Sequence, residues 1–223
     1  MARVIAIDGP SGSGKSSTSR RVGRALGFLH VDSGALYRIM TWQCLAQGVE
    51  TSDPAAVAAC AERVQVECRP ANGALAYYVD GEAPGARIRT PEINAHASPV
   101  ATVKAVRDRI TALLRGMTRY GDLVVEGRDI TTVVFPDSPA RFYLTASPEA
   151  RARRRQLEEV ATGVANQSAE AVKASLLARD AIDSTRAYAP LRKADGVLEI
   201  DSTQLTLDQV VETVLDALPA GWR

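Results

Sequence analysis

The chain has 223 residues, of which 46% are hydrophobic and 24% charged, as is typical of one soluble globular α/β domain with a sizeable core. A formal net charge of +1 argues against a protein that binds nucleic acid through bulk electrostatics. No apolar run approaches the roughly 20 residues of a membrane span, and the three cysteines have no metal-binding spacing, so we expect a cytoplasmic protein with reduced thiols.

A phosphate-binding loop near the N-terminus is the most informative motif. Residues 9–17 read GPSGSGKSS and fit the pattern G-x-x-x-x-G-K-S/T, with an apolar strand-like run before them and a helical pattern after them. Glycines let backbone N–H groups turn toward a phosphate, and the following helix aims its N-terminus at the anion. In this motif Lys15 contacts the β- and γ-phosphates and the Ser16 hydroxyl ligates Mg²⁺, although ATPases, GTPases and kinases share it. The residues expected to bind ATP are Gly9, Pro10, Ser11, Gly12, Ser13, Gly14, Lys15, Ser16 and Ser17.

Five short apolar runs predict buried parallel strands, and helical patterns separate most of them. This alternation is typical of a doubly wound sheet flanked by helices. Ligands bind beyond the carboxyl ends of such strands, and polar residues follow four of these ends, so we expect one rim of polar groups. The predicted strands are Val4–Ile7, Phe28–Val31, Leu123–Val125, Arg141–Leu144 and Val197–Ile200.

The second predicted strand is followed by Ser33 and Gly34, which can begin a helix. Tyr37 and Arg38 then lie one turn into that helix, where a phenol and a guanidinium can hold a second anion. A capped helix with an exposed arginine would show the same pattern, so these residues alone leave both interpretations open.

The sequence changes in texture between residues 62 and 95. Two short apolar runs, at 64–68 and 75–79, flank the turn-like segment PANG at 70–73. Paired runs around such a turn predict a small antiparallel insertion of short strands.

The polar segment after the third predicted strand is another candidate site. Glu126 can orient Mg²⁺ through water, Arg128 can bridge phosphates, and Asp129 is available for a base edge or a metal. A tight turn with a local ion pair is the alternative interpretation.

Arginines gather in two later helical segments. Residues 151–155 hold four arginines, more than the nearby acids can pair, so we expect a polyphosphate to neutralise them; a solvated basic face is the alternative. Arg179, Asp183 and Arg186 have the spacing of one face of a helix predicted to begin near Ala169. An exposed ladder of ion pairs would have the same spacing.

Taken together, these arginines exceed what one ATP needs, and a second phosphate-bearing substrate is the simplest explanation. A phosphate monoester has its second pKa near ~6, so its oxygen is already an anion at neutral pH. An enzyme that phosphorylates it needs positioning and charge neutralisation rather than a general base. The alternatives are a P-loop kinase of a small-molecule hydroxyl, with Asp32 as the base, and an ATP-driven regulatory switch.

Nearly the whole chain resembles the bacterial cytidylate kinases, a family of nucleoside monophosphate kinases. The matching segments are IDGPSGSGKSS at 7–17, DSGALYR at 32–38, IRTPEINAHAS at 88–98, GRDITTVVFPD at 127–137, LTASPEARARRR at 144–155, RDAIDSTRAYAPL at 179–191 and IDST at 200–203. The resemblance implies one α/β P-loop kinase domain over residues 1–223, with a five-stranded parallel sheet, a nucleotide-monophosphate-binding insertion at 62–95 and a helical lid at 151–168. It implies a Mg²⁺-dependent monomer that transfers the ATP γ-phosphate to CMP and dCMP, with no nucleic-acid or membrane partner.

The resemblance also implies roles for individual residues. Together with the loop and the arginine cluster it indicates a catalytic set of Lys15, Arg128, Arg151, Arg154 and Arg155. It implies that the CMP phosphate is bound by Tyr37, Arg38, Arg128 and Arg186. It implies that cytosine is bound by Ser98, Arg107 and Asp129, and the ribose by Arg179 and Asp183, with Ser33 as a further contact to CMP. An aspartate is the natural acceptor for the exocyclic amine of cytosine, which supports the role of Asp129.

Two local departures from the family pattern stand near the site. The family often has aspartate where this chain has Glu126, and glycine where it has Thr131. The first bears on the Mg²⁺ site, for which Ser16 is the expected ligand and Glu126 a water-mediated one. The second bears on the shape of the turn that carries Asp129.

Overall fold

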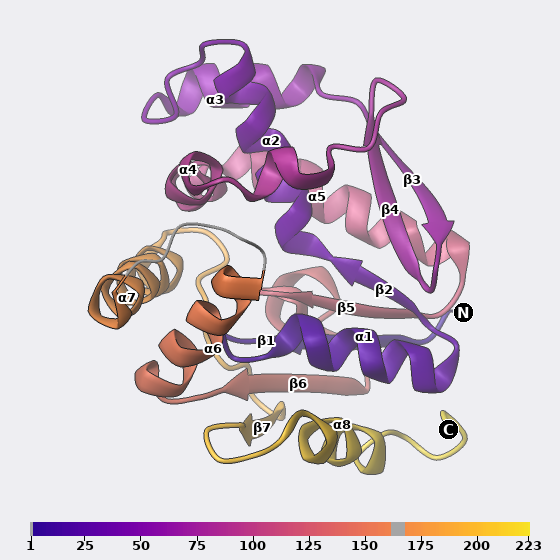
Figure 1. Cartoon of the computed structure of the whole chain (residues 1–223). Helices are drawn as coiled ribbons and strands as arrows, with labels where there is room; N and C mark the ends of the chain where they lie inside the picture. The colour runs from indigo at the N-terminus through magenta and orange to yellow at the C-terminus, as the bar shows by residue number, and fades with distance from the viewer. Residues whose placement is uncertain (1, 162–167) are drawn as a thin grey trace.

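The computed structural model describes residues 2–161 and 168–223, which fold around one seven-stranded sheet in the order β3-β4-β2-β5-β1-β6-β7 (Figure 1). Neighbouring strands run parallel except for the antiparallel pair β3 and β4. The strands are β1 Val4–Asp8, β2 Leu29–Asp32, β3 Val66–Ala71, β4 Ala74–Val79, β5 Leu123–Gly127, β6 Ala140–Thr145 and β7 Leu198–Asp201. The α/β fold class and the five predicted parallel strands are confirmed.

The predicted strand number is wrong, because the antiparallel hairpin is not a separate sheet. The hairpin turns at Asn72 and Gly73, both with positive φ, and β4 then lies parallel to β2 where His30 pairs with Ala74. The His30 N–H also donates to the Gly73 carbonyl at 3.0 Å. Pairing with β2 satisfies backbone groups that an isolated hairpin would leave to water, so the hairpin extends the edge of the main sheet.

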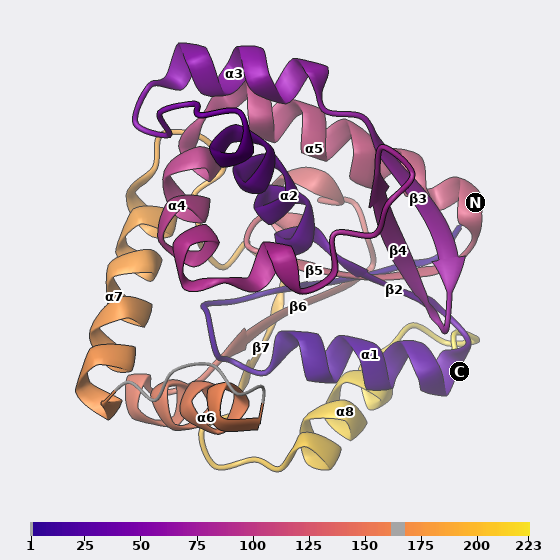
Figure 2. The same cartoon turned by 45° about the horizontal axis from the view of Figure 1, so that its top comes forward.

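Helices cover both faces of the sheet. In Figure 2, α1 and α8 lie on one side of it, and α2, α3, α4 and α5 lie on the other. The helices are α1 Lys15–Leu26, α2 Ser33–Ala46, α3 Pro54–Arg63, α4 Pro91–Thr102, α5 Lys104–Gly116, α6 Pro148–Ala161, α7 Ala169–Thr185 and α8 Leu207–Asp216, with short turns of 3₁₀ or π helix at Gly85–Arg89, Met117–Tyr120 and Ile130–Val134. None of these helices is long and apolar enough to cross a membrane.

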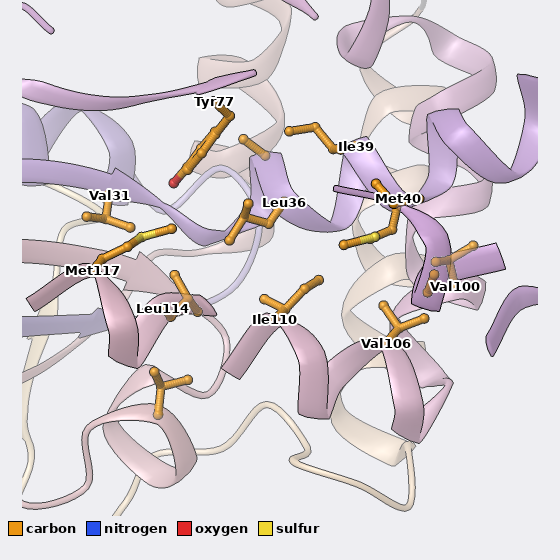
Figure 3. Packing of buried hydrophobic residues seen from close by; sticks show 14 of the residues in the cluster. Val31, Leu36, Ile39, Met40, Tyr77, Val100, Val106, Ile110, Leu114 and Met117 are labelled. Atoms are coloured by element: carbon orange, nitrogen blue, oxygen red, sulfur yellow. The ribbon is translucent and has the colours of Figure 1, made fainter. Parts of the chain in front are cut away.

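Two hydrophobic cores fill the space between the sheet and these helices. Successive residues of a strand point to opposite faces, so Ile5 and Ile7 of β1 pack with α1 and α8 while Ala6 packs with α2 and α5. Figure 3 shows the larger core, where Leu36 of α2 faces Ile110 of α5. The side chains of the central strands β1 and β5 are buried on both faces, which makes the carboxyl ends of these strands a rigid platform for the site.

Two predicted helices on the site side have the expected starts. Helix α6 begins after Ser147, whose Oγ accepts the Ala150 N–H at 3.2 Å, and α7 begins at Ala169 as predicted. The prediction that Arg186 belongs to the latter helix is wrong, because α7 ends at Thr185 and Arg186 is its extended C-terminal cap. Residues 162–167 of the expected lid lie outside the described residues.

Candidate active site

A cleft of about 460 Å³ opens at the carboxyl ends of the central strands. One side is lined by the phosphate-binding loop with the start of α1, and the opposite side by α2, α4, α5, the segment after β5 and α7. Every residue expected to contact CMP lines this one cleft, namely Ser33, Tyr37, Arg38, Ser98, Arg107, Arg128, Asp129, Arg179, Asp183 and Arg186. Of the loop, Ser11, Gly12, Ser13, Gly14, Lys15, Ser16 and Ser17 line it, whereas Gly9 and Pro10 do not.

Close packing and the backbone conformation of the loop require glycine at two of its positions. A Cβ at Gly9 would lie 1.9 Å from the Leu144 carbonyl oxygen, so only glycine fits against β6. Gly14 has φ of 93° and leaves the N-terminus of α1 without a side-chain cap. The first N–H groups of α1 therefore remain available for an anion, as a phosphate site requires.

Lys15 is buried beneath this loop and points back onto it. Its Nζ donates to the Pro10 carbonyl at 2.7 Å and to Ser13 Oγ at 3.4 Å. Burial, with the positive charge of Arg128 nearby, lowers the pKa of Lys15 to about 7. A bound polyphosphate would stabilise the ammonium form, because a nearby opposite charge favours the charged state.

A hydroxyl and a carboxylate meet beside the loop at the position expected for Mg²⁺. Ser16 Oγ donates to Glu126 Oε2 at 2.8 Å, and His30 Nε2 lies 2.9 Å from Glu126 Oε1. Mg²⁺ prefers oxygen ligands and keeps several water and phosphate ligands of its own, so one hydroxyl and one carboxylate fit it. His30, which the sequence shows only as an isolated histidine, lies directly behind this pair.

The side opposite the loop holds two sets of Arg–Asp contacts. Arg107 Nη2 lies 2.5 Å from Asp129 Oδ2, with both side chains 4% exposed, and the Arg107 guanidinium lies 5.2 Å from the Tyr37 ring centre. Asp183 Oδ2 accepts from Arg128 Nε at 3.0 Å, and its Oδ1 lies 3.4 Å from Arg186 Nη1. Burial raises the pKa of Tyr37, so its phenol stays protonated and can donate to a phosphate.

The arginines of α6 divide into two groups. Arg154 and Arg155 line the cleft, and Arg154 donates to Ser202 Oγ at 2.9 Å. Arg151 does not line it: this side chain is buried, donates to the carbonyls of Ala146 and Ser11, and forms an ion pair with Asp180. The donors of Arg151 therefore anchor α6 to the loop, and its catalytic role stays a prediction.

Several site residues were not predicted. Asp180 accepts the Ser11 N–H at 3.2 Å in addition to pairing with Arg151, so it ties α7 and α6 to the loop. Asp32 also lines the cleft and was predicted only as the base of the alternative hydroxyl kinase. The lining residues that were not predicted are Thr18, Gly34, Arg89, Ala97, Ala101, Gly127, Glu158, Ser202, Leu205, Leu207 and Val210. The matching segment at 200–203 was the only sequence signal for the part around Ser202.

Asp8, at the end of β1, holds the turn that carries Arg128 and Asp129. Its Oδ1 accepts the Ile130 N–H at 2.8 Å, and its Oδ2 accepts the Thr131 N–H at 2.7 Å and Thr131 Oγ1 at 2.6 Å. The Thr131 hydroxyl therefore adds a bond that a glycine at this position would lack. Despite these bonds, complete burial raises the pKa of Asp8 to about 6.

The raised pKa of Asp8 predicts a pH-dependent cost to stability. Between its unfolded value of 3.8 and about 6 the native state binds the proton more tightly, so this contribution to stability falls as pH rises. We expect the free energy of unfolding of the wild type, minus that of Asp8→Asn, to fall by about 2 kcal/mol from pH 4 to pH 7. Urea unfolding at several pH values measures it, with the exposed Asp195→Asn as control; a constant difference would contradict this assignment.

The comparisons with known proteins confirm the resemblance to the cytidylate kinases. Residues 5–220 match the family model of cytidylate kinase. A cytidylate kinase of Streptomyces avermitilis is 46% identical over 216 residues, covering 96% of this chain and 91% of that protein. One of Shouchella clausii is 40% identical over 212 residues, covering 95% and 94%. Among solved structures, an uncharacterized protein from Eubacterium ventriosum superposes with a TM-score of 0.50 over 96% of both chains at 10% identity, which shows a shared fold alone.

Proposed function

The chain belongs to the cytidylate kinase family, and from that premise we propose that its cleft transfers the γ-phosphoryl group of ATP to CMP and also to dCMP. The observation that carries the proposal is the buried Arg107–Asp129 pair, which faces the phosphate-binding loop across one cleft. A carboxylate accepts from the exocyclic amine of cytosine and repels the carbonyl that uracil presents there. In this proposal the Arg107–Asp129 pair recognises cytosine and the loop binds ATP, both within one cleft.

The acceptor phosphate is proposed to lie among Arg38, Arg128 and Arg186. Asp183 pairs with both Arg128 and Arg186, and Arg38 bonds Asn94 of α4. Guanidinium groups fixed in this way need little reorganisation when a phosphate binds, which favours rapid transfer. The ribose lies beside Arg179 and Asp183 in this arrangement.

The donor phosphates are proposed to lie over the loop, with Mg²⁺ at the Ser16–Glu126 pair. When bound, Mg²⁺ supplies positive charge to the β- and γ-phosphate oxygens. Lys15 moves its ammonium from the Pro10 carbonyl to these oxygens, while Arg154 and Arg155 approach from α6. The chain's own contribution is therefore orientation and charge neutralisation rather than proton transfer.

The architecture around the cleft suggests two moving or binding parts. We propose that residues 151–168 close over the phosphates as a lid, anchored at Arg151, and that residues 62–95 contribute to binding the monophosphate. Arg89, from the second segment, lines the cleft and pairs with Asp32 at 3.1 Å. Both segments belong to a single kinase domain over residues 1–223.

A kinase of a small-molecule hydroxyl would need a general base, and Asp32 is poorly suited to that role. It caps α2 through the Ala35 N–H and pairs with Arg89. Although burial acts in the opposite direction, Arg89 and His30 bring the pKa of Asp32 below its ordinary value, which weakens it as a base.

A coupled ADP-release assay tests the proposed function. We expect rapid turnover with CMP and dCMP, and little with UMP, AMP, shikimate or no acceptor. Rapid turnover with shikimate would favour a hydroxyl kinase, and ADP release independent of any acceptor would favour an ATP-driven switch.

Arg154→Ala is expected to lower kcat and kcat/KM together, because its guanidinium lies in the cleft and neutralises charge that develops during transfer. The structure offers Arg153→Ala as a matched control, since Arg153 is its exposed neighbour on α6 and does not line the cleft. Initial rates at saturating ATP and CMP measure the effect. An unchanged kcat in Arg154→Ala would make this arginine an anchor for Ser202 alone.

A further inference from the structure

The carboxylate of Glu126 is held from two sides in the interior. Its Oε2 accepts from Ser16 Oγ at 2.8 Å, and its Oε1 lies 2.9 Å from His30 Nε2. The side chains of His30 and Glu126 are each 5% exposed. A hydrogen bond on one carboxylate oxygen fixes the direction in which the other points, so the histidine controls how Glu126 faces Ser16.

The sheet brings these residues together from distant parts of the sequence. Strand β2 lies parallel to β5 with His30 opposite Val124 and Asp32 opposite Glu126. His30 and Asp32 are two residues apart, as are Val124 and Glu126, so side chains at these positions point to the same face of the sheet. The imidazole on β2 therefore reaches the carboxylate on β5 diagonally, where that strand ends at the cleft.

The Glu126 side chain is long enough that a neighbour is needed to fix the direction of its carboxylate, and His30 contacts that carboxylate. Glutamate has one more rotatable bond than aspartate, the shorter carboxylate side chain. Unless a neighbour fixes the added torsion, the carboxylate loses conformational entropy when it must point at a cation. Partners that orient metal-binding groups typically account for a 10–100-fold change in metal affinity.

We propose that His30 is a positioning residue: it holds Glu126 toward the Ser16 hydroxyl and thereby raises the affinity of the ATP-loaded cleft for Mg²⁺. This inference rests on the proposed function, in which the Ser16–Glu126 pair serves Mg²⁺. His30 itself does not line the cleft, so it would act on the cation through Glu126.

Isothermal titration of the full chain with ATP, once in EDTA and once in excess Mg²⁺, tests the proposal without turnover. At a known concentration of free Mg²⁺, the ratio of the two Kd values gives the factor by which Mg²⁺ changes the affinity of the protein for ATP. By linkage, ATP changes the affinity for Mg²⁺ by the same factor, and we call this factor the coupling. We expect His30→Leu to lower this coupling by about tenfold and to leave the Kd in EDTA unchanged. Equal coupling in wild type and His30→Leu, or an equal loss of ATP affinity with and without Mg²⁺, would overturn the proposal.

Two further variants separate the hydrogen bond from packing. His30→Gln places an amide N–H near the former Nε2 and should restore most of the coupling, whereas His30→Asn ends short of Glu126 and should behave as His30→Leu does. If His30→Leu does not fold, His30→Asn serves in its place as the variant without the hydrogen bond to Glu126. His96→Leu, which removes the chain's other histidine and its bond to Thr51, is the matched control and should retain the wild-type coupling. Failure of His30→Gln to restore coupling that His30→Asn loses would contradict the hydrogen-bond origin.

The titration with ATP and the ADP-release assay can fail independently of each other. Wild-type protein whose ATP binding responds to Mg²⁺ through His30, but which gives no ADP with CMP, would contradict the acceptor and support the positioning role. Normal turnover with CMP and a coupling indifferent to His30 would overturn the positioning role alone.

Discussion

Lys15→Ala is expected to lower kcat by roughly 10²–10³-fold while leaving the fold intact, the largest loss that any single substitution here should cause. Lys15 is the buried ammonium under the phosphate-binding loop, and its Nζ donates to the Pro10 carbonyl and to Ser13 Oγ of that loop. Charge on the transferring group shifts in the transition state, and a fixed positive charge at this place stabilises that shift more than it stabilises bound ATP. Turnover and circular dichroism on the same sample measure both parts of the prediction.

An exposed lysine supplies the control for this substitution. Lys104 on α5 pairs with Asp108 at the surface, and Lys104→Ala should keep wild-type turnover. If Lys15→Ala turned over ATP and CMP near the wild-type rate, the loop would have no catalytic part and the direction of transfer across the cleft would have to be reconsidered.

Asp129→Asn is expected to lower the preference for CMP over UMP by one to two orders of magnitude. The carboxylate is proposed to accept from the cytosine amine, and a hydrogen bond to a charged group is worth about 1.5–3 kcal/mol, with each 1.4 kcal/mol equal to a factor of ten. An amide can donate as well as accept, so the variant should tolerate uracil. The values of kcat/KM for both nucleotides, in wild type and variant, measure the preference.

The buried partner of Asp129 adds a second expectation for the same variant. Arg107 would then face a neutral amide in a site where both side chains are 4% exposed, so the melting temperature should also fall. Asp108→Asn neutralises an exposed carboxylate one residue from Arg107 and should change neither quantity. A variant that melts earlier but keeps the full preference for CMP would leave base selection to Ser98 and Arg107.

The contact between Glu126 and His30 could not be predicted from the sequence. Glu126 was predicted as a metal-site residue because it follows a buried strand, but nothing near His30 in the sequence indicates that it lies behind that carboxylate. The two residues are 96 positions apart, and only the parallel pairing of β2 with β5 brings them within 2.9 Å. A contact of this kind depends on which strands become neighbours, and local patterns do not encode that choice.

The arginines of α6 show the same limit within one helix. The density of arginines, together with the family resemblance, predicted a shared catalytic role for Arg151, Arg154 and Arg155. Arg151 instead meets Asp180, 29 residues later, and Ser11, 140 residues earlier, and is buried between them. Arg154, one helical turn further on, reaches the cleft. Both side chains are long, charged and on the same helix, so their partners rather than their own chemistry decide which of them can contact a phosphate.

The features that could be predicted from the sequence are local ones: the strand, loop and helix of the phosphate site, the five parallel strands and the start of α7. Near neighbours in the chain set these, through steric limits on the backbone, glycine conformation and the period of apolar residues. Three contacts depend on long-range packing: the hairpin joins the main sheet through His30 and Ala74, Asp8 holds the turn bearing Asp129, and Arg107 pairs with Asp129. These contacts form because burial removes water from polar groups and obliges each to find a partner, and the partner is supplied by whichever distant segment the packed sheet places beside it.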